Sequence, residues 1–358
     1  MTFDLASLGW DADFAAAFTR YGRPGTRPAR VTRVDRGIAT VLGVAGTERA
    51  SLGGGHLLRA SRDPLQLPCA GDWVAVRTWP DRRVTLESVL PRRTQVLRNE
   101  SREHSTRGQV LAANVDVLAV VEPIDPSPDL GRVERLLALA YESGACPVVL
   151  LTKADRAQRP AVIAHQVAAA AAGAEVHPVS ARTGAGLEIV AGLVAGDRTL
   201  GLLGTSGSGK STLVNELAGA TVMNTQEIRR ADGRGRHTTT YRALIPLPGG
   251  GAVLDTPGIR AVGVFDGGLD EAFSDIEALA AGCRFRDCEH GGEPGCEVWA
   301  AVEAGDLSTR RLDSWRKLRR ELHWQTTRRA ARQAALARVN WKYLPKSVRR
   351  AKPRVREV

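Results

Sequence analysis

Apolar and polar residues alternate with a period of two between Arg30 and about Arg107. The segments "ARVTRV" and "IATVLGV" flank the turn "DRG", and "DWVAVRTW" and "RVTLESVL" flank the turn "PDR". Such alternation between closely spaced turns predicts the short strands of a small β-barrel over residues 30–107. A five-stranded oligonucleotide-binding barrel fits this pattern, and other small barrels fit it as well. Residues 1–29 precede the barrel as a leader, in which we expect one helix around "DADFAAAF".

From residue 108 the pattern changes to continuous apolar runs that alternate with helical segments. The runs include "NVDVLAVV", "CPVVLL", "EVHPVS", "RTLGLL" and "GAVLD". Strands that are apolar on both faces and alternate with helices are typical of a doubly wound sheet covered on both sides. We therefore expect an α/β domain over residues 108–268 and a helical domain with a basic tail over 269–358. In that last domain Leu312, Trp315, Leu318 and Leu322 recur at helical spacing and should face a core.

Charge is unevenly distributed along the chain, whose formal net charge is +11. Residues 310–358 contain 17 Lys/Arg and 3 Asp/Glu, so the basicity belongs mainly to the tail. Such a density of positive charge favours a polyanion such as nucleic acid over a plain solvated helix face. A second set of arginines predicts a basic outer surface on the barrel: Arg30, Arg33, Arg36, Arg92, Arg93, Arg98 and Arg102.

Composition excludes other classes of protein. A content of 43% hydrophobic and 25% charged residues is typical of a globular protein. The chain has no apolar run of about 18 residues, so no membrane-spanning helix is expected. The start "MTFDLASLGW" does not resemble a secretion signal, so we expect a cytoplasmic protein without a membrane partner. The isolated residues Cys69 and Cys146 are expected to be ordinary buried thiols.

A phosphate-binding motif lies in the middle of the chain. Residues 204–211, "GTSGSGKS", match G-x4-G-K-[ST] between an apolar strand and a helix. Glycines let backbone N–H groups point at phosphate oxygens, and the helix N-terminus adds partial positive charge. Lys210 is expected to reach the β- and γ-phosphates, and the Ser211 hydroxyl to bind Mg²⁺. The predicted phosphate-binding residues are Gly204, Thr205, Ser206, Gly207, Ser208, Gly209, Lys210, Ser211 and Thr212.

Two further motifs end predicted strands and point to guanine. In "TKAD", residues Thr152, Lys153, Ala154 and Asp155, the Asp155 carboxylate can accept the two N–H donors of guanine, which adenine lacks. In "SAR" the backbone of Ser180 and Ala181 can contact the guanine oxygen. Either motif alone is more often a capped loop, but two at consecutive strand ends favour a base site.

Two motifs concern the metal ion and the γ-phosphate. "DTPG" follows the strand "GAVL", which lets Asp255 hold Mg²⁺ through water and the Gly258 N–H contact the γ-phosphate. The segment "GRGRHTTT", residues 233–240, lacks hydrophobic periodicity and predicts a mobile loop whose threonine completes the Mg²⁺ shell. We favour Thr239 for this role, with Thr238 as the alternative.

The segment Cys283-x4-Cys288-x-His290-x5-Cys296 supplies three thiols and an imidazole within a glycine-rich stretch. These four side chains make a complete tetrahedral ligand set, which is typical of structural rather than catalytic zinc. Four unrelated residues of a reducing compartment are the less favoured interpretation.

The order TKAD, SAR, phosphate loop, GRHTTT and DTPG resembles that of the circularly permuted GTPases. With the barrel before these motifs and the Cys/His segment after them, residues 30 to 345 resemble the ribosome small subunit-dependent GTPase A family. The resemblance implies a GTP hydrolase that uses GTP and GDP, Mg²⁺ and one structural zinc. It also implies a partner, the small ribosomal subunit and its rRNA, which stimulates hydrolysis late in subunit maturation. We expect a monomer that binds no DNA.

Two departures from the common GTPase pattern bear on the mechanism. Thr152 stands where the base-reading motif usually has Asn, and Ile259 stands where many GTPases have a water-orienting Gln. A hydrocarbon side chain cannot orient water, so intrinsic hydrolysis should be slow and His237 becomes the candidate catalytic group, partly through the family resemblance. Two other interpretations stay open on the sequence alone: a P-loop ATPase without guanine specificity, and a nucleotide-regulated RNA-binding protein.

Overall fold

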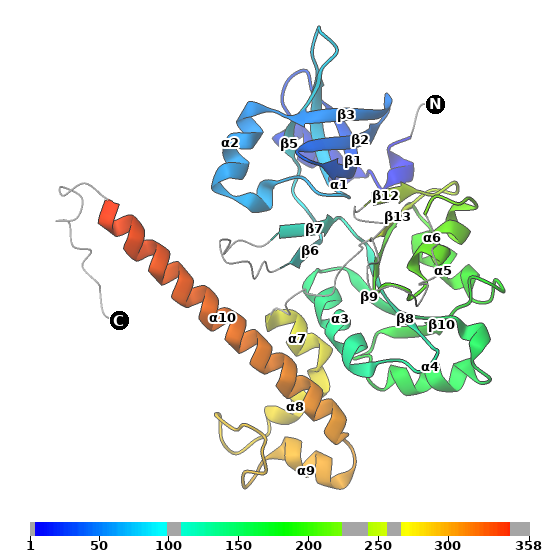
Figure 1. Cartoon of the computed structure of the whole chain (residues 1–358), viewed down its shortest axis with the longest axis vertical. Coiled ribbons are helices and arrows are strands. Elements are labelled where there is room, and N and C mark those ends of the chain that lie inside the picture. Colours follow the sequence, from blue (N-terminus) through cyan, green and yellow to red (C-terminus); the bar gives the residue numbers. More distant parts are fainter. Residues whose placement is uncertain (1–3, 99–108, 224–242, 256–265, 344–358) are drawn as a thin grey trace, which may run out of the picture.

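The computed structural model describes residues 4–98, 109–223, 243–255 and 266–343 (Figure 1). The barrel expected from the alternating pattern is present as a closed sheet in the order β1-β2-β3-β5-β4. Its strands are β1 (Arg27–Asp35), β2 (Ile38–Gly43), β3 (Gly46–Leu52), β4 (Trp73–Thr78) and β5 (Val84–Val89). Helix α2 (Gly54–Arg62) and the 3₁₀ turn η2 (Pro64–Gln66) connect β3 to β4. The barrel closes because β3 runs parallel to β5 while β1 pairs with both β2 and β4.

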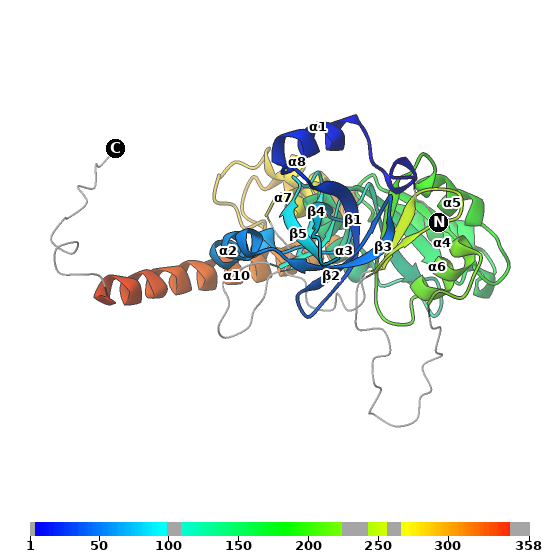
Figure 2. The ribbon, with the colours of Figure 1, turned by 90° about the horizontal axis from the view of Figure 1, so that it is seen from above.

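The leader packs against the barrel rather than extending from it (Figure 2). It contains the turn η1 (Ala6–Leu8) and the expected helix, α1 (Ala12–Tyr21), which Asp11 caps by accepting two backbone N–H bonds. Trp10 and Phe14 lie against the buried Trp73 of β4. The leader thus adds a small aromatic core to the outside of the barrel.

Two of the arginines expected on the barrel surface are enclosed, Arg30 fully and Arg92 largely. Arg30 is 2% exposed and donates to the Leu8, Gly71 and Asn114 carbonyl oxygens, so it joins the leader, the barrel and the strand after the barrel. Arg92 pairs with the buried Asp72 at 2.7 Å. The expectation of a basic surface is wrong for these two residues, because each guanidinium satisfies polar groups inside a junction.

The central domain is built on one six-stranded sheet in the order β10-β9-β8-β11-β13-β12, parallel except for β12. The strands are β8 (Val117–Pro123), β9 (Cys146–Thr152), β10 (Glu175–Pro178), β11 (Thr199–Leu203), β12 (Ala243–Pro246) and β13 (Ala252–Asp255). Helices α3 (Leu130–Glu142) and α4 (Pro160–Ala168) cover one face, and α5 (Leu187–Val194) and α6 (Lys210–Ala218) cover the other. The predicted doubly wound sheet is confirmed.

A hairpin that the sequence pattern does not reveal lies between barrel and sheet. Strands β6 (Gln95–Arg98) and β7 (Gln109–Ala113) pair antiparallel and form a separate two-stranded sheet. Cys146, at the start of β9, is exposed, so the expectation that it is buried is wrong, whereas Cys69 is buried as expected.

The C-terminal part consists of helices α7 (Asp266–Ala272), α8 (Ser274–Ala280), α9 (Glu297–Ala304) and the long α10 (Thr309–Tyr343). The expected apolar stripe of α10 is confirmed, because Leu312, Trp315, Leu318 and Leu322 are each at most 6% exposed in one core with Phe273. None of the helices within the described ranges is both long and apolar enough to cross a membrane.

Candidate nucleotide-binding site

The carboxyl ends of β8, β9, β11 and β13 meet at one edge of the parallel sheet, where open α/β sheets bind their ligands. After β11 the chain curls through residues 204–209, and α6 begins at Lys210. Gly204 has a φ of +158°, and a Cβ there would lie 2.4 Å from the Val121 carbonyl oxygen of β8. The loop therefore lies directly against the neighbouring strand, and only glycine allows this close approach.

Lys210 lies inside the curve of the phosphate loop. Its ammonium group donates to the Gly204 and Thr205 carbonyl oxygens at 2.9 and 2.8 Å, and the residue is 9% exposed. Burial lowers the pKa of Lys210, and the nearby Asp255 carboxylate opposes this shift. The two carbonyl oxygens and Asp255 favour the charged ammonium against this burial, and the ammonium lies inside the loop, where an anion gains most from its charge. In the same motif Ser208 is buried and Ser206, Gly207 and Thr212 are exposed.

Asp255 ends β13, next to the strand that leads into the phosphate loop. It is 3% exposed, and its Oδ1 atom has no hydrogen-bond partner among the described residues. Burial raises the pKa of Asp255, and Lys210 lowers it. A buried carboxylate oxygen without a donor is costly unless a cation or water satisfies it. The site thus fits the hard, oxygen-preferring Mg²⁺ ion expected from the sequence.

The TKAD and SAR motifs meet at the ends of β9 and β10. Asp155 accepts a hydrogen bond from the Ser180 hydroxyl at 2.6 Å and pairs with Arg182 at 2.7 Å. The Ser180 bond, followed by Arg182, lowers the pKa of Asp155 and so favours the ionised acceptor that a guanine needs. Lys153 has a φ of 59°, and the Ala154 N–H donates to the Val179 carbonyl oxygen. These contacts hold the carboxylate at the sheet edge.

Thr152 joins the base-reading motif to the phosphate loop. Its hydroxyl donates to the Ser208 carbonyl oxygen at 2.5 Å, and Thr152 is 5% exposed. Gly209 packs against the same side chain, because a Cβ on it would lie 3.4 Å from Thr152. The two motifs are more than fifty residues apart in sequence, yet one hydrogen bond connects them directly.

The structure brings together the described members of both motifs, but some predicted residues lie outside it. His237, Thr238, Thr239, Gly258 and Ile259 are not among the described residues. The pairing of Arg182 with Asp155 was not foreseen from sequence. The signal was the arginine that follows Ser180 and Ala181, at a strand end facing a carboxylate.

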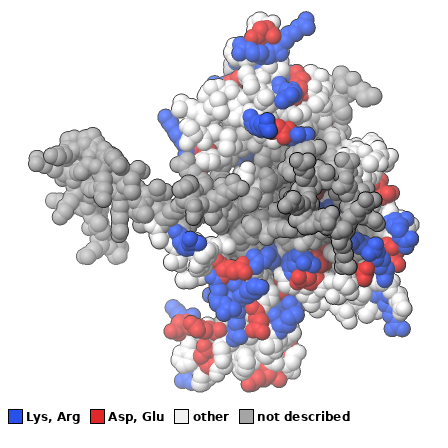
Figure 3. Space-filling view, viewed as in Figure 1, with Lys and Arg blue, Asp and Glu red and all other residues white. Residues whose placement is uncertain are grey.

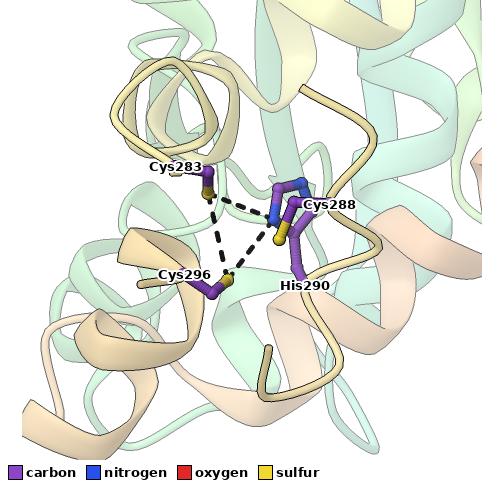
Figure 4. A group of neighbouring side chains, drawn as sticks. All are labelled: Cys283, Cys288, His290 and Cys296. Atoms are coloured by element: carbon purple, nitrogen blue, oxygen red, sulfur yellow. Dashed lines mark hydrogen bonds between the residues drawn. The ribbon is translucent and has the colours of Figure 1, made fainter. Parts of the chain in front are cut away.

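The four predicted zinc ligands lie together in the C-terminal part (Figure 4). The ligand atoms of Cys283, Cys288, His290 and Cys296 all lie within 4.8 Å of one another. His290 Nδ1 is 3.5 Å from both the Cys283 and the Cys296 sulfur, and Cys296 also caps α9. Three thiols and an imidazole converging on one point fit tetrahedral zinc, with no position left open for a substrate.

The site defines a P-loop GTPase of circularly permuted order. It has a glycine-rich phosphate loop, a buried carboxylate on the neighbouring strand of the sheet, and a base-reading loop that precedes both in the sequence. The chain matches the family model described as RsgA GTPase over residues 89–265. It is 48% identical over 343 residues to the "Small ribosomal subunit biogenesis GTPase RsgA" of Streptomyces coelicolor, covering 94% of this chain and 92% of that protein. The protein of the same name from Streptomyces avermitilis is 47% identical over 343 residues, covering 94% of this chain and 91% of the relative. The chain therefore belongs to the RsgA GTPase family.

Solved structures share the fold. YjeQ from Thermotoga maritima aligns with a TM-score of 0.60 and 24% identity, covering 83% of this chain and 98% of the other. YloQ, described as a circularly permuted GTPase, aligns with a TM-score of 0.59 and 22% identity, covering 85% and 97%.

Proposed function

We propose that this GTPase binds the small ribosomal subunit and its rRNA, and that it hydrolyses GTP to GDP and phosphate as a switch late in subunit maturation. The names of its curated relatives support the partner. The hydrogen bond from Thr152 to Ser208 is the main support for the proposed site, because it places the base-reading motif next to the phosphate loop. The protein would act as a cytoplasmic monomer without DNA or membrane partners.

In this proposal the loop from Gly204 to Thr212 binds the phosphates and Lys210 stabilises the charge that develops on them. Asp155 reads the two N–H donors of guanine, Lys153 lies along the base, and Ser180 and Ala181 contact its oxygen. Thr152 and Ala154 hold this loop in place. Guanine rather than adenine is favoured because the ionised Asp155 offers only acceptors.

Mg²⁺ would neutralise charge on the β- and γ-phosphates when bound. Ser211 and Asp255 would hold it, and the orphaned Asp255 oxygen supports the second ligand. Thr239 would complete the shell, the Gly258 N–H would contact the γ-phosphate, and His237 would act in hydrolysis. These last three roles rest on the family resemblance and on Ile259, which cannot orient water.

Zn²⁺ would be structural and held by Cys283, Cys288, His290 and Cys296. Its loop supports α10, because the Arg316 guanidinium donates to the His290 carbonyl oxygen and the Trp315 ring lies 5.4 Å from the imidazole. Loss of the ion should therefore loosen the start of α10.

The test is GTP turnover by the purified protein with and without small ribosomal subunits. We expect slow turnover alone, strong stimulation by the subunits, and little activity in Lys210→Ala under both conditions. Unstimulated turnover in the presence of small subunits would refute the partner. In parallel, Asp155→Ala should lose the preference for GDP over ADP in calorimetry, and an unchanged preference would refute the base site.

A further inference from the structure

Helix α10 carries an exposed row of three cations and one tryptophan. Lys317, Arg320, Trp324 and Arg328 follow one another at spacings of three and four residues, which places them on one face. All four are exposed, whereas Leu318 and Leu322 on the opposite face are buried. We call these four residues the basic–aromatic stripe.

Trp324 differs from the other tryptophan of this helix whose side chain is described. Trp315 is 2% exposed and donates its indole N–H to Glu277 at 3.0 Å. Trp324 is 55% exposed, and the Arg328 guanidinium lies 4.4 Å from its ring centroid. The Trp324 indole leaves a large flat apolar surface in water, so core packing does not explain a tryptophan at this position.

The charges of the stripe are not neutralised by the fold. Within the ranges that the structure covers, Lys317, Arg320 and Arg328 form no ion pair with a carboxylate. Three cations in the first turns of α10 are paired: Arg310 and Arg311 contact Glu134, and Arg316 contacts Asp313. Basic side chains are also seen over the described part of α10 in Figure 3. The stripe is therefore a surface of positive charge that suits a polyanion.

The stripe is held in a fixed place on the molecule. The Arg311 guanidinium bonds to Asp275 at 2.6 Å and to Glu134 at 3.0 Å, and Glu321 pairs with Arg135 of α3 at 2.7 Å. These contacts fasten the first half of α10 to α3 and α8, while its second half projects from the body (Figure 1). A ligand on the stripe would thus be positioned relative to the GTPase sheet.

We propose that the basic–aromatic stripe binds unpaired RNA, with the Trp324 ring stacked on a base and Lys317, Arg320 and Arg328 contacting phosphates. An aromatic ring between cations is how proteins bind single strands, since every base has a face that can stack. A lipid surface is less suited, because it requires a continuous apolar face and the stripe has one apolar residue. This proposal rests on the proposed function for the source of the RNA, but binding to an oligonucleotide does not depend on it.

The experiment measures binding of the full-length protein to a short oligoadenylate and to an RNA duplex of equal length, by fluorescence anisotropy over a range of salt. Trp324→Ala should weaken binding of the single strand about 5- to 100-fold and leave duplex binding and the salt dependence unchanged. Arg320→Ala and Arg328→Ala should weaken both RNAs and each reduce the salt slope by about one.

Two variants provide matched controls. Trp324→Phe keeps a stacking ring and should retain most single-strand affinity. Phe285→Ala removes another exposed aromatic ring, 45% exposed with Arg284 beside it, and should leave RNA binding unchanged. Circular dichroism checks that α10 stays folded in each variant.

Three results would overturn the proposal. Trp324→Ala could bind oligoadenylate as tightly as the wild type, or it could lose the same affinity for the single strand and for the duplex. It could also weaken binding to anionic vesicles while leaving RNA binding unchanged. A failure of small subunits to stimulate wild-type GTP turnover would refute the proposed function and leave the oligonucleotide result standing. Normal stimulation of the wild type, with no effect of Trp324→Ala on oligoadenylate binding, would refute only the stripe.

Discussion

Replacement of Thr152 by valine tests the link between the two halves of the nucleotide site. Valine has nearly the same shape as threonine but cannot donate a hydrogen bond, so the packing against Gly209 stays. The Ser208 carbonyl oxygen then loses the donor that lies 2.5 Å away in a buried position. The substitution therefore removes one interaction between the base-reading motif and the phosphate loop, together with a longer contact of 3.5 Å from the hydroxyl to the Glu122 carbonyl oxygen.

A buried acceptor left without its partner costs about 1–3 kcal/mol. We expect the free energy of unfolding of the nucleotide-free protein to fall by about 1–2 kcal/mol in urea titrations. If the nucleotide must supply about 1.4 kcal/mol to order the loosened loop, GDP affinity falls about tenfold in calorimetry. The preference for GDP over IDP should stay, because Asp155, the proposed acceptor of the 2-amino group, is unchanged.

Thr152→Ser keeps the hydroxyl and should restore most of the GDP affinity. The reasoning fails if Thr152→Val binds GDP as tightly as the wild type with unchanged stability. It also fails if the guanine preference is lost, since Thr152 would then act on the base rather than on the phosphate loop.

Four further predictions concern other parts of the molecule. Chelation of zinc, or Cys296→Ser, should lower the melting temperature of the C-terminal helices while GDP binding persists, as followed by near-ultraviolet circular dichroism and calorimetry. Glu134→Gln leaves Arg311 without its buried carboxylate partner and should cost about 3 kcal/mol in urea unfolding. Arg135→Gln, which breaks the partly exposed pair with Glu321, should cost at most about 1 kcal/mol. Because burial raises the pKa of Asp255 above its usual 3.8, the stability that this group contributes is present below pH 3.8 and is lost as pH rises through its folded pKa. Its Mg²⁺-dependent GTP affinity should run the opposite way and fall as pH drops toward that pKa, and Asp255→Asn should abolish both pH dependences. On the small subunit, hydrogen exchange in residues 269–343 should differ between GDP and a non-hydrolysable GTP analogue, and identical exchange on and off the subunit would refute nucleotide coupling to this region.

The elements that sequence reasoning found are those that local pattern determines. The phosphate loop follows from glycine spacing between an apolar strand and a helix, and Gly204 confirms the requirement by its contact with β8. The core stripe of α10 follows from helical periodicity, and the Cys/His cluster from ligand spacing. Each of these signals lies within a few turns of chain, so burial and backbone geometry can be inferred without knowing the fold.

The features that escaped prediction depend on segments that are far apart in sequence. The barrel closes through the parallel pairing of β3 with β5, and β6 pairs with β7, which follows it after residues 99–108. The alternating pattern of the strand predicts a surface position for Arg30, but the leader and the Asn114 carbonyl oxygen enclose its side chain. No local pattern distinguishes such a guanidinium from an exposed one, because its burial is decided by where other segments pack.

The permuted order places the C-terminal helices after Asp255 in the sequence. Strand β13 ends at Asp255, and the next described element, α7, begins at Asp266 and packs on α3. The Gly268 N–H donates to Glu142 at 2.9 Å, and a Cβ on Gly268 would lie 2.0 Å from the Ala138 carbonyl oxygen, so α7 touches the backbone of α3. Helix α3 in turn leads into β9, which ends at Thr152 of the base-reading motif. Asp255 ends a strand beside the phosphate loop, and α7 packs on the helix that leads into β9, so a displacement of α7 would have to change its contacts with α3.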